Sequence, residues 1–264
     1  MAKGVCKLTG HSGKFVDSHI LPKALTRHAQ KGEGFIQAGA GTRPERRFSS
    51  WYDNRLVTAE GEAILSKIDD WAISALREHK LVWSGWGPIQ SISNLVAEKI
   101  PDTKWGIRFI HGLDARRLRL FFLSLLWRAA ASDRWEMSQV SLPQEDLETL
   151  RIKVLTSDPE PISFYPVRIL QLSTVGPTHN YSPIKLTGEH RHSGSGIFRF
   201  YFEGLMAHVA INRNETGAKQ VGSLALGSED RIIVPAVPYE SSLQSDLVRD
   251  TVLNAVDLFG PRMP

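Results

Sequence analysis

The segment from Asp114 to Ala131 constrains the fold more than any other part of the chain. Its residues are apolar around almost the whole circumference of a helix, and a helix of this kind is normally buried in the middle of a fold. The apolar run that begins at Leu118 is interrupted by Arg119, Ser124 and Arg128, and it is shorter than the ~20 residues that a membrane-spanning helix needs. We therefore expect a fold packed around this helix and no membrane association.

The charged residues of this segment have two predicted roles. Arg128 lies among apolar residues, so we expect a buried carboxylate partner such as Glu148 or Asp146, because buried charges are normally paired. The start of the segment carries three arginines that suit either phosphate contacts or a charged surface: Arg116, Arg117 and Arg119.

Apolar spacing predicts further helices on both sides of the central one. Apolar residues between Thr58 and Leu76 recur every three or four positions, and Thr58 is a suitable N-cap. A shorter helix is predicted over Ser91 to Ile100, another over Pro143 to Leu155, and a last one over Ser242 to Phe259. The first ~50 residues lack such a pattern and are rich in glycine, which is typical of hairpins and loops.

After Pro161 the pattern favours strands. The segments 162–172, 196–212 and 232–238 are rich in β-branched and aromatic residues. Within the second segment, Phe198, Phe200 and Phe202 alternate with other residues, which predicts a half-buried strand. The expected fold class is α+β, with an irregular N-terminal module, a helical middle and a mixed, β-rich C-terminal part.

Composition limits the chemistry of the chain. One cysteine in 264 residues excludes an intramolecular disulfide framework and argues against a structural four-cysteine zinc. The first residues contain no apolar stretch of the kind found in secretory signals. We expect a cytoplasmic protein.

The net charge of +4 is unevenly distributed. Residues 1–47 contain nine basic and three acidic residues, a net charge of +6, whereas the remainder contains 23 basic and 25 acidic residues. A basic segment on a nearly neutral body is typical of a polyanion contact. A basic, solubilising surface explains the charge equally well.

Short motifs in the N-terminal half resemble one family. Cys6-Lys7-Leu8-Thr9 is followed by Ser18-His19-Ile20-Leu21-Pro22-Lys23, then by Trp51-Tyr52-Asp53, and later by Leu123-Ser124-Leu125-Leu126-Trp127-Arg128-Ala129. In this order they resemble the bacterial and phage-borne HNH-type endonucleases of the ββα-metal class with zinc knuckles. The four knuckle positions would be Cys6, Thr9, Thr58 and Gly61, of which three no longer carry a thiolate. Packing of Trp51, Tyr52 and Trp71 would then replace the metal.

The resemblance implies a domain organisation and a set of site residues. Residues 1–82 would form the degenerate HNH-like module and residues 83–264 a family-specific α+β domain. His19 would be the general base, with Asn54 and Glu62 as further catalytic residues, and Mg²⁺ or Mn²⁺ the catalytic metal. The ligands of that metal are not identified by spacing; the candidates are Asp17, Asp53, Asn54 and Glu62, of which the last three also suit turn or helix-start positions. The residues expected to contact nucleic acid are Lys23, Arg27, Arg43, Arg46 and Arg47.

Two functions follow from these motifs. The first is a DNA-targeting endonuclease or nickase of a phage-defence system or mobile element. The second is a catalytically inactive descendant that binds nucleic acid, or a protein partner, within a larger defence complex. A further run, residues 189–192 (Glu-His-Arg-His), suits an exposed loop better than a metal site.

Overall fold

A seven-stranded mixed sheet lies at the centre of the computed structural model, which describes residues 2–26, 33–39, 44–187, 196–211, 219 and 221–259. The strand order is β11-β12-β13-β9-β14-β8-β7. Only β9 and β14 pair in parallel; the other neighbours are antiparallel. The strands are β7 (Glu98–Lys99), β8 (Gly106–Ile110), β9 (Val167–Leu172), β11 (Ile184–Leu186), β12 (Ile197–Phe202), β13 (Leu205–Ala210) and β14 (Ile232–Val237). The fold is therefore α+β, as predicted.

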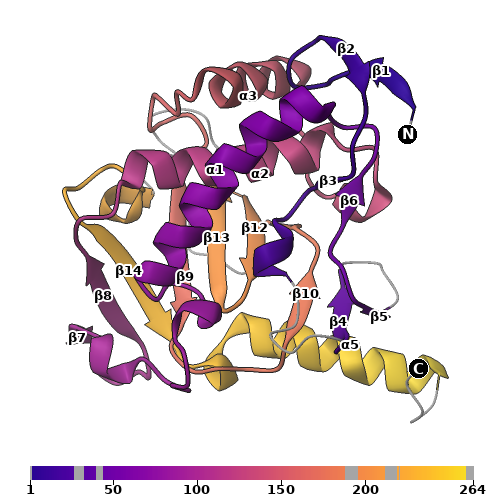
Figure 1. Cartoon of the computed structure of the whole chain (residues 1–264). Helices are drawn as coiled ribbons and strands as arrows, with labels where there is room; N and C mark the ends of the chain where they lie inside the picture. The colour runs from indigo at the N-terminus through magenta and orange to yellow at the C-terminus, as the bar shows by residue number, and fades with distance from the viewer. Residues whose placement is uncertain are drawn as a thin grey trace.

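Helices cover one face of this sheet (Figure 1). They are α1 (Ala59–Glu78), α2 (Ala115–Ala131) and α3 (Gln144–Thr156). The predicted central helix is α2, which is buried almost throughout and contacts both α1 and α3. Its Phe122 ring stacks on Phe202 of β12, with ring centroids 6.2 Å apart. The apolar pattern of α2 thus positions the helix layer against the sheet.

The opposite face of the sheet carries a second hydrophobic cluster that includes Leu172, Tyr201 and Met206. Beside it lies a three-stranded sheet in which β4 (Phe35–Ala38) pairs in parallel with β10 (His179–Tyr181) and antiparallel with β5 (Glu45–Arg47). The C-terminal helix α5 (Leu243–Phe259) runs along the bottom of the view in Figure 1. Short 3-10 helices occupy Lys23–Leu25, Trp83–Gly85, Ser93–Leu95, Trp135–Met137, Gly222–Leu224 and Tyr239–Ser241.

The N-terminal segment forms two small antiparallel pairs. β1 (Lys3–Val5) pairs with β2 (Ser12–Lys14), and β3 (Ser18–His19) pairs with β6 (Tyr52–Asp53), directly before α1. Cys6 and Trp51 belong to the same hydrophobic cluster as α2 and β12. The two predicted parts of the chain therefore share a core, and the boundary at residues 82 and 83 stays a prediction from sequence.

Several predicted elements differ from the observed ones. The helix predicted over Ser91 to Ile100 is wrong: this segment forms a single 3-10 turn and β7, which pairs with β8. Segment 162–172 becomes a strand only at Val167, and segment 196–212 is a hairpin of β12 and β13. β12 is buried on both faces, so Phe198, Phe200 and Phe202 do not mark a half-buried strand. A second layer covers their neighbours, which a single alternating pattern does not reveal.

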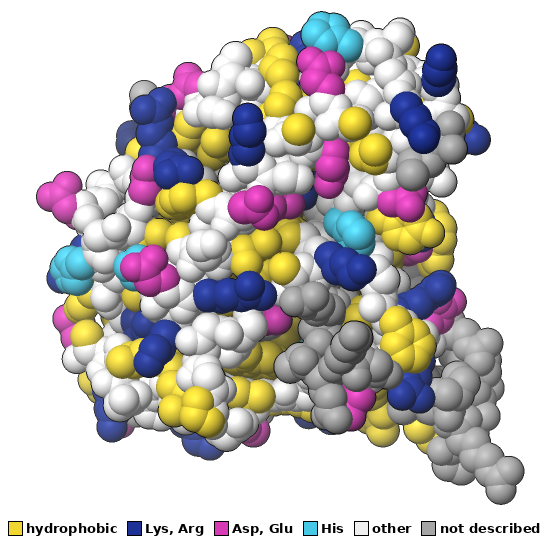
Figure 2. All heavy atoms as spheres, in the orientation of Figure 1, with side chains coloured by type: hydrophobic (Ala, Val, Ile, Leu, Met, Phe, Trp, Pro, Cys, Tyr) yellow, Lys and Arg dark blue, Asp and Glu magenta, His cyan; other side chains and the backbone are white. Residues whose placement is uncertain are grey.

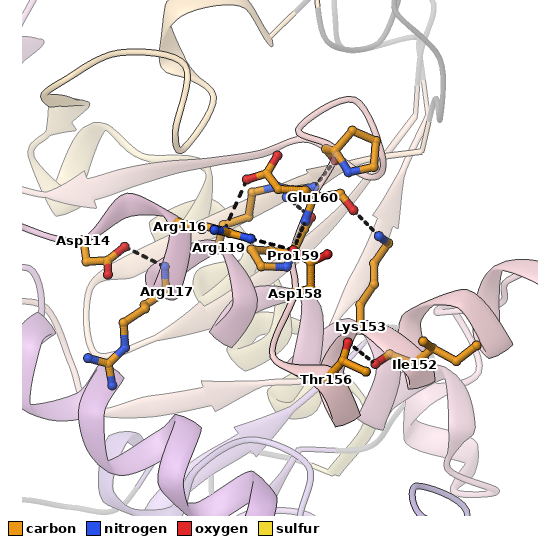
Figure 3. Close-up of polar contacts among 11 residues, drawn as sticks. Asp114, Arg116, Arg117, Arg119, Ile152, Lys153, Thr156, Asp158, Pro159 and Glu160 are labelled. Carbon is orange, nitrogen blue, oxygen red and sulfur yellow. Dashed lines mark hydrogen bonds and ion pairs between the residues drawn. The ribbon is translucent and has the colours of Figure 1, made fainter.

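The three arginines near the start of α2 hold the chain rather than a free surface (Figure 3). Arg116 pairs with Asp158 at 2.7 Å, and the buried Arg119 donates to the carbonyl oxygens of Pro161 and Phe164 at 2.8 and 2.6 Å. The Arg117 guanidinium lies 4.3 Å from the Trp71 ring centroid. The contacts of Arg116 and Arg119 secure the loop after α3 against α2, and that of Arg117 joins α2 to α1. In the described part of the chain, no helix is long and apolar enough to cross a membrane.

Candidate functional site

The four residues at the knuckle positions come together around the Cys6 sulfur. The Thr9 N–H donates to Cys6 Sγ at 3.4 Å, and a Cβ atom added at Gly61 would lie 2.7 Å from the same sulfur. Cys6 is 1% exposed. Burial raises the pKa of the Cys6 thiol, but hydrogen bonds from the Thr9 side chain and from the backbone of Thr9, Thr58 and Leu8 lower it to below its usual value. Residues from two segments 50 positions apart therefore meet at one point.

The turn that carries Cys6 connects β1 to β2. The Cys6 N–H donates to the His11 carbonyl oxygen and the Gly10 N–H donates to the Cys6 carbonyl oxygen, both at 2.9 Å. Gly10 has φ of +75°, a backbone conformation that glycine adopts without strain. α1 begins directly after Thr58. The hairpin and the start of α1 are thus joined by packing around the Cys6 side chain.

His19 lies on β3, the strand that follows the β1–β2 hairpin in the sequence. Its strand pairs with β6 so that His19 faces Tyr52 in register, and their ring centroids are 6.1 Å apart. His19 Nε2 lies 3.4 Å from Ser49 Oγ, and the ring is neither fully buried nor fully exposed. The order strand, strand, helix formed by β3, β6 and α1 leaves an imidazole at the surface.

The carbonyl oxygen of His19 is held by a buried ion pair. Arg128 donates to it at 3.2 Å and also donates twice to the Asp69 carboxylate, at 2.9 and 2.6 Å. The side chain of Arg128 is 1% exposed and that of Asp69 16%. The prediction that Arg128 pairs with Glu148 or Asp146 is wrong, because α1 and not α3 faces this residue of α2.

Burial is the main cause that lowers the pKa of His19 below its usual value. The positive charges of Lys23 and Arg128 lower it further, whereas Asp17 and Asp69 act in the opposite direction. An imidazole with a lowered pKa is neutral at pH 7, which is the form that accepts a proton. The His19 side chain therefore has the protonation state that a general base requires.

Asp53 and Asn54 occupy a turn after β6. The Asp53 carboxylate is buried and accepts from Ser132 Oγ at 2.7 Å and from the Arg55 N–H at 2.8 Å. Both of its oxygens are thereby used to close the turn and to attach it to the end of α2. Asn54 is exposed on the same turn. The structure therefore gives Asp53 a structural role and brings neither residue into a hydrogen bond with His19.

Glu62 lies in the first turn of α1, beside the knuckle positions. Its Oε2 atom is buried without a hydrogen-bond partner within the described residues. Asp69, which belongs to the His19 surroundings, lies seven residues later, or about 10 Å along the helix axis. Glu62 thus follows Gly61 at the Cys6 cluster, whereas Asp69 is the carboxylate of α1 that is linked to His19 through Arg128.

The candidate metal ligands do not converge. Asp17 is exposed, Asp53 is engaged in its turn, and Glu62 lies two helical turns from Asp69. Among the residues that the structure describes, no three His, Cys, Asp or Glu side chains form a group that could hold a metal ion.

Three of the basic side chains expected to contact nucleic acid are exposed: Lys23, Arg46 and Arg47. Lys23 acts electrostatically on His19, and Arg47 pairs with Glu45. Figure 2 shows basic, acidic and hydrophobic side chains interspersed on the face in view. Two further predicted contacts, Arg27 and Arg43, and the run at residues 189–192 lie outside the described residues.

Sequence reasoning did not identify several residues of this site. Ser49 Oγ lies beside His19 Nε2, and Asp69 pairs with the Arg128 that holds the His19 carbonyl oxygen. Arg134 donates to the Tyr52 carbonyl oxygen at 3.1 Å. Of the three aromatic residues expected to replace the metal by packing, Trp51 is buried and Trp71 is partly buried against the same core, whereas Tyr52 is 42% exposed and is not part of the core. Trp51 directly precedes the short strand that begins at Tyr52, and consecutive side chains of an extended segment point to opposite sides. No protein-family model, no curated protein and no solved structure matches this chain.

Proposed function

We propose that this chain binds DNA through the face that carries His19, as the degenerate HNH-like component of a phage-defence system or a mobile element. The observation that carries the proposal is the meeting of Cys6, Thr9, Thr58 and Gly61 at one buried point. These are the positions at which the resemblance expects zinc ligands. A chance match of short motifs gives no reason for residues of two distant segments to surround a single sulfur.

Charge supports the choice of ligand. Lys23, which acts electrostatically on His19, and Arg46 are both exposed, and the segment up to residue 47 carries a net charge of +6. Each phosphate that a Lys or Arg neutralises releases counterions, so binding weakens steeply as salt rises. Exposed cations around a neutral histidine suit a phosphate backbone better than an apolar partner.

A second candidate function, phosphodiester hydrolysis, is favoured by the lowered pKa of His19. A neutral imidazole nitrogen would take a proton from a water molecule, and the resulting hydroxide would attack the phosphorus atom. The bond from phosphorus to the leaving oxygen would break, and that oxygen would take a proton from solvent. The general base is the only group of this step to which we assign a residue, so we rank hydrolysis second.

The binding proposal is tested by measuring the affinity for a fluorescent DNA oligonucleotide at several salt concentrations. We expect Lys23→Ala and Arg46→Ala each to weaken binding and to reduce the slope of log K against log salt by about one. Lys99→Ala, an exposed lysine of β7 at the far edge of the sheet, is the matched control and should bind like the wild type. Equal affinities for all four proteins, or no binding at 50 mM salt, would refute the proposal.

The hydrolysis proposal needs a separate assay. Supercoiled plasmid is incubated with wild-type protein or His19→Ala, with Mg²⁺ or Mn²⁺ added. Nicking by the wild type that disappears in the variant would assign the general base to His19. If neither protein nicks the plasmid while both bind it, the chain is a binding module.

A further inference from the structure

Two exposed aromatic rings, Phe48 and Tyr52, lie on the short segment that contacts His19 through Ser49 and Tyr52. Phe48 is 62% exposed and Tyr52 42% exposed, and they lie on either side of the short segment that carries Ser49. Single exposed hydrophobic residues are common on proteins and need no explanation. Two rings beside a neutral histidine and several cations form a more specific arrangement.

Contacts place the Tyr52 ring near the imidazole and attach the segment between the two rings to His19. The Tyr52 ring centroid lies 6.1 Å from that of His19, with the ring planes inclined by 51°. Ser49 Oγ lies 3.4 Å from His19 Nε2, and Phe48 is the residue directly before Ser49. The backbone of Tyr52 is fixed by pairing with β3 and by the hydrogen bond from Arg134. The Tyr52 ring is therefore presented on an anchored strand.

Cations accompany the rings. The Arg46 guanidinium carbon lies 5.8 Å from the Phe48 ring centroid, and Arg46 is itself exposed. Lys23 is exposed and acts on the His19 pKa, which places its ammonium group within electrostatic reach of the imidazole. Aromatic side chains alternating with cations are the combination by which proteins hold single strands, since bases stack on the rings while the cations follow the phosphates.

We propose that this surface binds unpaired nucleotides, with bases stacked on Phe48 and Tyr52 and phosphates near Lys23 and Arg46. The inference rests on the proposed nucleic-acid function and specifies its ligand. In a duplex the base faces are covered by their neighbours, so a protein ring reaches them only where the strand is unpaired. Phosphate contacts alone would not distinguish the two forms.

The test compares four labelled ligands by fluorescence anisotropy at one salt concentration. They are a single-stranded DNA oligonucleotide, its duplex, a single strand of equal length made of abasic sites, and a single-stranded RNA of the same sequence. The abasic strand keeps the phosphates and removes the bases, so it isolates the stacking contribution. The RNA shows whether DNA or RNA is the preferred source of unpaired nucleotides.

The variants remove the rings but keep apolar side chains. Phe48→Leu and Tyr52→Leu should each weaken binding of single-stranded DNA about tenfold or more, with no change for the abasic strand. Tyr52→Phe keeps the ring and should bind like the wild type. Trp105→Leu is the matched control, because Trp105 is also 42% exposed but lies beside β8 at the other end of the sheet. Far-UV circular dichroism establishes that each variant folds.

The outcomes separate this inference from the proposed function. If the abasic strand binds as tightly as the normal strand, or if the leucine variants bind single strands like the wild type, stacking is refuted while DNA binding stands. If the wild type binds the duplex more tightly than the single strand, the preference for unpaired nucleotides is refuted. If no nucleic acid binds, both proposals fail.

Discussion

Replacing Gly61 by alanine tests whether the knuckle positions meet as the structure describes. At an ordinary helix interior, glycine to alanine stabilises a protein by about 1 kcal/mol. Here the new Cβ would lie 2.7 Å from Cys6 Sγ and 3.0 Å from the Val57 Cβ. Overpacking of a buried site typically costs about 1 to 3 kcal/mol. We expect Gly61→Ala to lower the free energy of unfolding by about 1 kcal/mol, the opposite sign to that of a free helical site.

Making Gly61→Ala in a second background measures how much the contact with the Cys6 sulfur contributes to its effect on stability. In Cys6→Ala the atom that the new Cβ would meet is absent, and only the contact with Val57 remains. Gly61→Ala should then be neutral or stabilising, so its effect should differ between the two backgrounds by about 1 to 2 kcal/mol, within the range known for residues in contact. Urea denaturation of the four proteins measures both effects.

A control in the same helix checks that the difference is local. Ser74 is exposed on α1, and Ser74→Ala should change stability by less than about 0.5 kcal/mol in both backgrounds. A Gly61→Ala variant that is more stable than the wild type by about 1 kcal/mol, or an effect that is equal in both backgrounds, would show that Cys6 and Gly61 do not pack together. The structural basis for the degenerate knuckle would then be lost.

Two further predictions concern buried charge. Asp69→Asn leaves the guanidinium of Arg128 buried without a carboxylate, and it should lower the free energy of unfolding by about 3 to 5 kcal/mol. The control Asp246→Asn removes an exposed pair with Arg249 and should change the free energy of unfolding by less than about 0.5 kcal/mol in the same urea titration. Similar losses in both variants would contradict the burial of the Asp69–Arg128 pair. His179 is buried and stacked on Tyr201, and burial lowers its pKa from 6.5 to about 4. As pH falls, the His179 side chain of the unfolded chain is protonated before that of the folded protein. The free energy of unfolding should therefore keep its full value above pH 6.5 and should decrease by about 3 kcal/mol between pH 6.5 and pH 4. His179→Gln should remove most of that pH dependence, and an unchanged slope would refute the reasoning.

The local sequence pattern was sufficient to predict the position of each helix that has an unambiguous apolar face. α1, α2 and α3 begin and end within two residues of the predicted positions, because spacing of apolar residues and the caps are properties of consecutive residues. Segment 91–100 shows the limit of such reasoning. Its apolar spacing suits a helix, but Glu98 and Lys99 pair with β8, and that partner cannot be recognised from the segment itself.

For the candidate site too, the sequence pointed to one residue, and only the structure shows which distant residues hold it. His19 was identified from its string, and the structure leaves its side chain partly exposed on a short strand. Asn54 and Glu62 were named from the resemblance alone, and no hydrogen bond among the described residues joins either one to His19. The residues that hold His19, Arg128 and Asp69, are separated from it by 109 and 50 positions.

The sequence by itself determined the α+β class, the burial of α2 and the basic character of the N-terminal segment. Each of these depends on residue type and on spacing within one stretch of chain. Only the tertiary structure decided that Arg128 pairs with Asp69, that Gly61 faces the Cys6 sulfur, and that Tyr52 and Ser49 contact the imidazole. Those pairings depend on which helix turn and which strand face meet after packing, and packing is set by the whole core rather than by any one segment.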